Sequence, residues 1–269
     1  MKNFILKPLE NKKILITRAQ TQQAEARKIF EAQGAIVIDF PTLVIGPPEN
    51  SNLLDQAINN LEKYDWIVFS SNNGVNSIEN KLNIIGKSLS DFVNLKIAAV
   101  GKKTSARLEQ IGVSVDFVPP EFVADSLIKY FPVTNIRGAK FLLPRVQSGG
   151  RNILKKSFID LGAYVDEIPA YESFCPKNVP NEVINSISSN NVKAIVFTSG
   201  KTVANSVQLL LKSIGESWQD NFTDIRIVSI GPQTSLNCKK YFGRVDAEAN
   251  PHDLDGLLQA CISALKNVS

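Results

Sequence analysis

Short apolar runs alternate with longer amphipathic segments along most of the chain. The runs 14–16 and 66–69 are continuous stretches of apolar residues, which is typical of buried parallel strands. Each run is followed by a polar loop and then by a segment with helical periodicity. In 22–33, for example, Ala26 and Phe30 fall on one helical face, and a glycine follows the predicted helix. Strands that alternate with helices through short loops predict parallel sheets covered by helices on both faces.

The chain contains this pattern twice. Lys13-Ile-Leu-Ile-Thr-Arg returns as Lys140-Phe-Leu-Leu-Pro-Arg, at an offset of 140 − 13 = 127 residues. Ile67-Val-Phe-Ser-Ser returns as Ile195-Val-Phe-Thr-Ser, at an offset of 195 − 67 = 128 residues. Further matched blocks keep the same order, which indicates a duplicated unit. We therefore predict an α/β fold with two similar flavodoxin-like lobes, each built on a parallel sheet.

One segment in each half departs from this alternation. Residues 37–44 and 165–174 each carry a proline and place polar residues at alternate positions. They are either ordinary strands followed by loops or a two-stranded antiparallel linker that joins the lobes. The linker interpretation, which the repeat supports, assigns 1–36 and 175–269 to lobe one, 44–166 to lobe two, and 37–43 and 167–174 to the linker strands.

Composition narrows the class of protein. With 269 residues, 43% hydrophobic and 21% charged, the chain is long enough for two lobes with their own cores and is typical of a soluble globular protein. The net charge of +4 does not indicate nucleic-acid binding and suits an acidic small molecule. Three widely spaced cysteines form neither a disulfide framework nor a metal-binding pair. The apolar run 4–6 near the N-terminus is too short for the core of a signal peptide or for a membrane span, so we expect a cytoplasmic protein.

Polar loops follow the predicted strands in both halves. They are 17–18, 70–72, 101–104, 145–150, 198–200 and 231–234, and they are rich in Ser, Thr, Gly or Arg. Helix capping explains any one of them. Ligands of parallel α/β proteins, however, bind beyond the carboxyl ends of the strands, where helix N-termini point. The agreement across both halves favours a receptor for a ligand with many carboxylates.

Other chemistries lack the residues that they need. His252 is the only histidine, so a Ser-His-Asp centre would depend on it alone, and an exposed loop before a helix explains its position. The loop 101–104 lacks the glycine and hydroxyl spacing of a phosphate-binding P-loop. No GxGxxG follows a strand, and no His, Cys and Asp cluster has the spacing of metal ligands. We therefore expect neither a metal nor an organic cofactor.

Tyr171 lies in the second linker candidate, in the segment Pro169-Ala-Tyr-Glu-Ser. A phenol at this place can donate a hydrogen bond to a leaving hydroxyl or act as a general acid. An aromatic side chain that only packs the linker is the alternative, and the sequence supports both equally.

Six motifs occur in a fixed order along the chain: Ile16-Thr-Arg18, Val68-Phe-Ser-Ser71, Val100-Gly101 with Thr104, Pro169-Ala-Tyr171, Val196-Phe-Thr-Ser199 and Ile230-Gly-Pro232 with Thr234. Together they resemble uroporphyrinogen-III synthase. No single motif is specific, but their order and spacing are. The resemblance implies two α/β lobes joined by a two-stranded antiparallel linker, an active site in the cleft between them, and no cofactor.

The resemblance also implies a reaction. Members of this family cyclise hydroxymethylbilane, a linear tetrapyrrole with acetate and propionate arms, to uroporphyrinogen III, with inversion of ring D and loss of water. The chain would then be a lyase of tetrapyrrole (heme) biosynthesis, with Tyr171 as the catalytic residue that assists departure of the hydroxymethyl oxygen. The residues implied to bind substrate are Thr17, Arg18, Ser70, Ser71, Gly101, Thr104, Arg145, Thr198, Ser199, Gly231 and Thr234.

We expect a monomer that acts on this small molecule, binds neither nucleic acid nor membrane, and transiently contacts hydroxymethylbilane synthase. Two other classes stay open. One is a non-catalytic regulatory relative that binds polyanions or tetrapyrroles, against which the retention of Tyr171 and of the polar loops argues. The other is a two-lobed solute-binding protein, which would normally carry an export signal.

Overall fold

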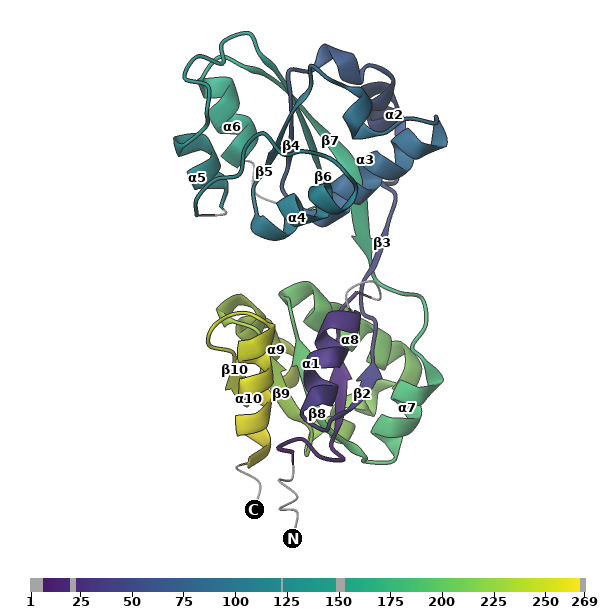
Figure 1. Ribbon diagram of the computed structural model, residues 1–269. Coiled ribbons are helices and arrows are strands. Elements are labelled where there is room, and N and C mark those ends of the chain that lie inside the picture. Colours follow the sequence, from purple (N-terminus) through teal and green to yellow (C-terminus); the bar gives the residue numbers. More distant parts are fainter. Residues whose placement is uncertain (1–6, 20–22, 122, 149–152, 267–269) are drawn as a thin grey trace. The chain divides into compact units, whose positions relative to one another are not determined.

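The computed structural model describes residues 7–19, 23–121, 123–148 and 153–266 (Figure 1). The chain folds into two compact units, which we call unit 1 (residues 1–44 and 174–269) and unit 2 (residues 45–173). Each unit contains a five-stranded sheet. The predicted α/β class with parallel sheets is confirmed.

The sheet of unit 1 has the order β10-β9-β8-β1-β2, and all its strand pairs are parallel. Its strands are β1 (Lys13–Ile16), β2 (Ile36–Asp39), β8 (Val192–Phe197), β9 (Arg226–Ser229) and β10 (Ala247–Glu248). Helices α1 (Gln23–Ala32) and α10 (Leu254–Lys266) cover one face. Helices α7 (Asn181–Ser188), α8 (Gly200–Ile214) and α9 (Pro232–Phe242), with the short 3₁₀ helix Glu216–Phe222, cover the other.

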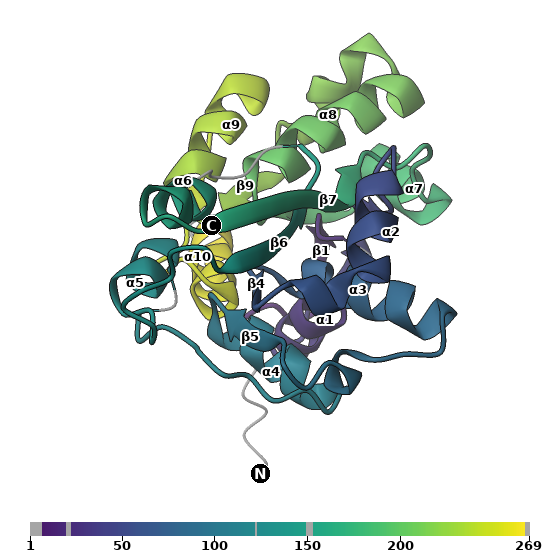
Figure 2. The ribbon, with the colours of Figure 1, turned by 90° about the horizontal axis from the view of Figure 1, so that it is seen from above.

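The sheet of unit 2 has the order β3-β7-β6-β4-β5, most of which can be followed in Figure 2. Its strands are β3 (Val44–Gly46), β4 (Trp66–Phe69), β5 (Lys96–Ala99), β6 (Lys140–Val146) and β7 (Tyr164–Phe174). Helices α2 (Asn52–Asn59), α3 (Asn72–Ile84) and α4 (Lys102–Gln110) cover one face. Helices α5 (Ala124–Lys129) and α6 (Ile153–Asp160) cover the other, and short 3₁₀ helices occupy Leu61–Lys63 and Leu89–Asp91.

The sequence repeat has a counterpart in the hydrogen bonds of the two units. The Asp116 carboxylate accepts the backbone N–H of Ile97 at 2.7 Å, and the Asp246 carboxylate accepts that of Ile227 at 2.6 Å. Both pairs are related by the same offset, since 246 − 116 = 130 and 227 − 97 = 130. The same contact therefore secures the start of β5 in unit 2 and the start of β9 in unit 1.

Each unit combines parts of both repeats. Strands β1 and β2 of the first repeat join β8, β9 and β10 of the second in unit 1. Strands β4 and β5 of the first repeat join β6 and β7 of the second in unit 2. The chain thus starts unit 1, builds unit 2 from a continuous segment, and then returns to complete unit 1.

Strand pairing locates the segments assigned to the linker. Residues 37–39 lie in the parallel ladder of β2 with β1, and residues 167–171 lie in that of β7 with β6. These parts therefore belong to the two sheets, and the linker bounds derived from the sequence stay a prediction. Strand β3 is the neighbour of β7 at the edge of the sheet in unit 2. An antiparallel linker stays a prediction.

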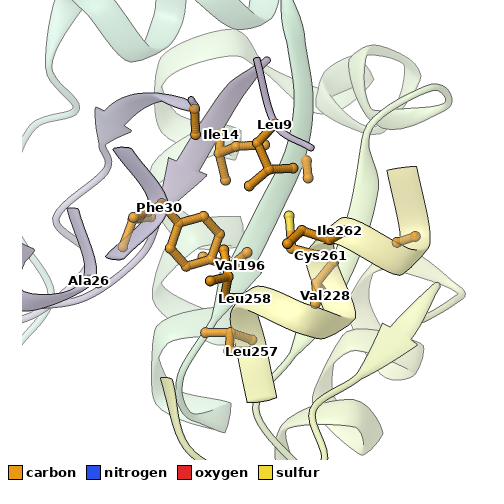
Figure 3. Close-up of a cluster of buried hydrophobic side chains, with 14 of the residues drawn as sticks. Leu9, Ile14, Ala26, Phe30, Val196, Val228, Leu257, Leu258, Cys261 and Ile262 are labelled. Atoms are coloured by element: carbon orange, nitrogen blue, oxygen red, sulfur yellow. The ribbon is translucent and has the colours of Figure 1, made fainter. Parts of the chain in front are cut away.

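Apolar clusters pack on both faces of each sheet. Figure 3 shows the cluster on one face of unit 1, where Phe30 of α1 and Leu257 and Leu258 of α10 gather around Val196 of β8. Phe30 and Leu257 are fully buried. Full burial of such a side chain contributes about 1.5–3 kcal/mol to stability, so this cluster fastens helices from opposite ends of the chain to one sheet.

The three cysteines differ in burial and hence in expected reactivity. Burial raises the pKa of Cys238 and of Cys261 to about 12, and it also raises the pKa of the half-buried Cys175. The thiolate is the reactive species, so a disulfide reagent at about pH 8 should modify Cys175 first and slowly. Cys238 and Cys261 should react only in denaturant, as peptide mass spectrometry would show. Rapid native modification of all three thiols would contradict this assignment.

Candidate functional site

Polar residues lie at the carboxyl ends of the strands in unit 2. Ser71 follows β4 and is the N-cap residue of α3. Gly101 follows β5 and is the N-cap residue of α4, and its carbonyl accepts the N–H of Thr104 at 3.0 Å. Ser70, which precedes the cap of α3, is exposed, whereas Thr104 is buried. Two helix starts, each with donor N–H groups, thus lie beside each other at this edge.

Tyr171 reaches this edge through an irregularity in the sheet. Arg145 of β6 pairs with Pro169 of β7, but the next residue, Val146, pairs with Tyr171. Ala170 is therefore an extra residue, as in a β-bulge, and such bulges redirect the side chains that follow them. Both Ala170 and Tyr171 pack against the apolar cluster under α2, α3 and α4. The phenol consequently lies on the face of the sheet that α3 covers.

Helix α3 contacts both the bulge and the phenol. The Tyr171 hydroxyl lies 2.9 Å from Ser71 Oγ, and Ser71 Oγ also accepts the N–H of Gly74 at 3.2 Å. One turn further on, Ser77 Oγ donates to the carbonyl of Ala170 at 2.5 Å. The first two turns of α3 therefore fix the backbone of the bulge and the position of the phenolic oxygen.

Arg145 lies on the opposite face of the sheet. Side chains alternate between the two faces along β6, so Arg145 lies on the same face as Leu143, which belongs to the apolar cluster under α5 and α6. Arg145 Nη1 donates to Glu167 Oε1 at 2.9 Å, and Lys155 Nζ of α6 lies 3.8 Å from the other oxygen of the same carboxylate. The Arg145 and Glu167 side chains are only 12% and 17% exposed. The structure therefore does not bring Arg145 together with Tyr171. Gly149 and Gly150 of the predicted loop lie outside the described residues.

The corresponding edge of unit 1 repeats the helix starts. Ser199 is the N-cap residue of α8 and forms a capping box with Thr202, preceded by the half-buried Thr198. Gly231 is the N-cap residue of α9, and its carbonyl accepts the N–H of the buried Thr234 at 3.0 Å. The residues predicted in the two halves thus occupy equivalent places in the two units.

Thr17 and Arg18 follow β1 at this edge and differ in their contacts. Thr17 is fully buried, and its hydroxyl donates to the carbonyl of Val196 at 2.8 Å, which ties β1 to β8. The Arg18 side chain is 14% exposed and forms an ion pair with Glu25 at 3.5 Å. Its buried Nε has no hydrogen-bond partner among the described residues. The Thr17 hydroxyl has therefore used its one O–H donor, whereas Arg18 has a donor without a partner among the described residues.

Unit 1 has no counterpart of the phenol. The repeat offset places Leu43 at the position equivalent to Tyr171, since 171 − 128 = 43. Ser71 and Ser199 are equivalent by the same offset, since 199 − 71 = 128. The Ser–Tyr pair consequently belongs to unit 2, whereas the capped helix starts are shared by both units.

Neither the contact of Ser77 nor the extra residue at Ala170 was predicted from the sequence, because both depend on pairing between distant segments. His252 is exposed in the loop before α10, as interpreted, and its Nδ1 lies 2.8 Å from the carbonyl oxygen of Ala249. Its ring packs on Gly231, where an added Cβ would lie 3.3 Å from the ring. Glycine at this cap therefore leaves room for the imidazole.

Across residues 7–19, 23–121, 123–148 and 153–266, no three or more His, Cys, Asp or Glu side chains are grouped so that they could hold a metal ion. No helix in those same ranges combines the length and the apolar character that a membrane crossing requires.

The fold and these edges define a class: a parallel α/β protein of two repeat-related units, with capped helix starts at the strand ends and a phenol in unit 2. The chain belongs to the uroporphyrinogen-III synthase family. The family model described as "Uroporphyrinogen-III synthase HemD" matches residues 24–259.

Relatives match over nearly their whole length. The chain is 42% identical over 253 residues to a uroporphyrinogen-III synthase of Synechococcus elongatus, with 94% of this chain and 95% of that protein covered. It is 28% identical over 250 residues to a putative uroporphyrinogen-III synthase of Methanocaldococcus jannaschii, with 92% and 96% covered.

Solved structures share the fold. The uroporphyrinogen-III synthetase of Helicobacter pylori gives a TM-score of 0.64 at 13% identity, with 94% of this chain and 99% of that chain covered. A mutant uroporphyrinogen III synthase of Thermus thermophilus gives 0.56 at 15% identity, with 95% and 99% covered. At these identities the likeness concerns the fold alone.

Proposed function

We propose that this chain catalyses the uroporphyrinogen-III synthase reaction, the cyclisation of hydroxymethylbilane to uroporphyrinogen III with inversion of ring D and loss of water. The observation that carries the proposal is the 42% identity to a uroporphyrinogen-III synthase over 94% of the chain. The family match, which spans residues 24–259, supports it. The protein is thus a cyclising lyase of tetrapyrrole biosynthesis.

In this reaction Tyr171 assists the departure of the hydroxymethyl oxygen. The C–O bond breaks with its electron pair on oxygen, and a proton delivered to that oxygen completes a molecule of water. Electron density from the pyrrole nitrogen fills the vacated carbon, and release of the N–H proton gives a neutral azafulvene. Ring D then attacks through its substituted carbon, and the resulting spiro intermediate fragments and recloses with ring D inverted. The bond of Tyr171 to Ser71 at 2.9 Å supports a fixed place for the phenol.

The remaining site residues orient the substrate. The bilane is flexible and carries many carboxylates, so closure with inversion requires that its arms be held in one arrangement. A helix start contributes only about 0.3–1 kcal/mol to the binding of an anion, so several must act together. We assign this role to Thr17, Arg18, Ser70, Gly101, Thr104, Arg145, Thr198, Ser199, Gly231 and Thr234, and to the N–H groups of the helix start that Ser71 caps. The shared caps of α3, α4, α8 and α9 support the assignment.

The activity is tested with hydroxymethylbilane generated in the assay. The products are oxidised and the type I and type III isomers are separated by chromatography. The chain should give mainly the type III isomer, whereas heat-denatured protein should give the type I isomer of direct closure. Type I product alone from native protein would favour the non-catalytic tetrapyrrole-binding relative instead.

Arg18 offers a test of substrate binding. A hydrogen bond between charged groups contributes about 1.5–3 kcal/mol, so Arg18→Met should raise KM by roughly tenfold or more and change kcat little. The matched control is Arg27→Met on α1, since Arg27 is already paired with Glu31 and Asp39 at 2.7 Å. Steady-state kinetics should show no change in KM for the control. Equal KM values in all three proteins would remove Arg18 from the site.

We further propose that the protein acts as a monomer in the cytoplasm and receives the bilane in a transient contact with hydroxymethylbilane synthase. The three cysteines are unpaired, which is typical of a reducing compartment. Sedimentation of the protein alone tests the monomeric state, and sedimentation of its mixture with that synthase tests the contact. A stable dimer of this chain would contradict the monomeric state. A profile of the mixture that equals the sum of its separate components would contradict the contact.

A further inference from the structure

We propose that Ser71 is a positioning residue for Tyr171, whose proton it directs toward the substrate, and that holding a carboxylate arm is not its main role. This role rests on the proposed function, because it requires that the phenol act in the reaction. The observation that carries it is the 2.9 Å contact between Ser71 Oγ and the Tyr171 hydroxyl.

The hydrogen-bonding capacity of the serine limits how this contact can be used. A serine hydroxyl has one O–H donor and two acceptor lone pairs. The N–H of Gly74 at 3.2 Å occupies one lone pair, which leaves the O–H and the second lone pair of Ser71 for Tyr171. When Ser71 donates to the phenolic oxygen, the phenol's own proton points to a third group. During the reaction, that group is the leaving hydroxyl.

The start of α3 favours this direction. The Gly74 N–H is one of the donors at the N-terminus of a thirteen-residue helix that have no backbone acceptor within the helix, and it donates to Ser71 Oγ instead. This bond polarises the serine hydroxyl, which becomes a stronger donor. As the phenol gives up its proton, negative charge grows on its oxygen. The Ser71 O–H and the positive end of the helix then stabilise that charge.

The backbone and the ring of Tyr171 are held in place, so the direction of its O–H bond is the part of the phenol that can still change. The Ala170 carbonyl accepts from Ser77 Oγ at 2.5 Å, and the Tyr171 carbonyl accepts the N–H of Gln147 at 2.8 Å. These bonds fix the backbone before and after the phenol. The ring also packs against the apolar cluster under α3. The contact with Ser71 therefore fixes the rotation of the hydroxyl about the C–O bond.

Unit 1 provides an internal comparison. Ser199 caps α8 as Ser71 caps α3, but Leu43 stands where unit 2 has Tyr171. Helix capping at this position therefore needs no phenol. The Ser71–Tyr171 contact is an addition to the cap, found in the one unit that carries the tyrosine.

Substitutions at Ser71 separate the cap from the donor. Ser71→Thr keeps both the cap and the hydroxyl, so its kcat should stay within about threefold of wild type. Ser71→Asp keeps a good N-cap acceptor but has no O–H, and its carboxylate would take the phenol's proton as an acceptor. We expect kcat of Ser71→Asp to fall by about tenfold or more, with KM within about twofold and an unchanged midpoint of thermal unfolding.

Asn73→Asp is the matched control, because it adds a carboxylate to the same first turn of α3 and carries no assigned role. Its kcat should equal that of wild type. The double variant Ser71→Asp/Tyr171→Phe should be no slower than Tyr171→Phe alone, since a residue that acts through the phenol has no effect without it.

Each result decides between roles. If Ser71→Asp raises KM with kcat intact, or lowers kcat equally in the presence and absence of Tyr171, Ser71 acts on the substrate directly and the proposal is overturned. Unchanged kcat in Tyr171→Phe would overturn it as well. If the wild-type chain yields only type I product, the proposed function itself fails. Type III product from wild type with an unaltered Ser71→Asp variant removes the role of Ser71 alone.

Discussion

Tyr171→Phe should lower kcat for the type III isomer by roughly 100-fold, within the range that general acid–base groups contribute, and should leave the fold intact. The phenyl ring still packs against the cluster under α3, but the hydroxyl that lies 2.9 Å from Ser71 is lost. Without that donor, the hydroxymethyl oxygen must leave without a directed proton. The measurement is the initial rate of type III formation, with isomers separated by chromatography and the thermal midpoint recorded in parallel.

Tyr64→Phe is the control for this experiment. Tyr64 also belongs to unit 2 and packs against the same apolar cluster, but its hydroxyl donates to Asp166 at 2.7 Å. Burial and this carboxylate both raise the pKa of Tyr64. The variant should form the type III isomer at the wild-type rate. If both variants keep wild-type turnover, the catalytic assignment of Tyr171 is wrong.

Gly256→Ala should destabilise unit 1 by about 1–3 kcal/mol or more, the range found when atoms are forced into a packed site. A Cβ added to Gly256 would lie 1.9 Å from the carbonyl oxygen of Pro251, which is far inside contact distance. Either α10 or the preceding loop must shift to accommodate it. Because α10 supplies Leu257 and Leu258 to the cluster in Figure 3, a shift also disturbs the core.

Ser263→Ala is the matched control, since it also introduces alanine into α10 but at an exposed position. Its stability should change by less than about 0.5 kcal/mol. The free energies of unfolding are compared by urea denaturation of each variant. A Gly256→Ala variant as stable as Ser263→Ala would show that the loop before α10 yields without cost.

Local patterns predicted much of the fold. The apolar run 66–69 is strand β4, and the run 14–16 lies in β1, because a parallel strand buried on both faces needs apolar residues at successive positions. Ser71 and Ser199 could be recognised as caps because a helix start requires an acceptor for its free N–H groups. The repeat also predicted equivalent helix starts in the two halves, as the caps at Gly101 and Gly231 illustrate.

The rest depends on neighbours that are distant in sequence. The bond between Ser71 and Tyr171 joins residues 100 positions apart, and no local signal indicates that α3 and β7 meet. The extra residue at Ala170 exists only relative to β6, so a sequence pattern does not reveal it. The contact of Arg145 with Glu167 likewise follows from the adjacency of β6 and β7, which places Arg145 on the face away from the phenol.

The crossing of the repeats between the two units determines how the chain can be divided. A cut near the repeat boundary would leave two fragments, each with incomplete portions of two sheets and unpaired strand edges. Residues 45–173, by contrast, contain almost the whole sheet of unit 2 with both of its helical layers in one continuous stretch. The piece of this protein suited to separate expression is therefore its middle, and not either of the two copies visible in its sequence.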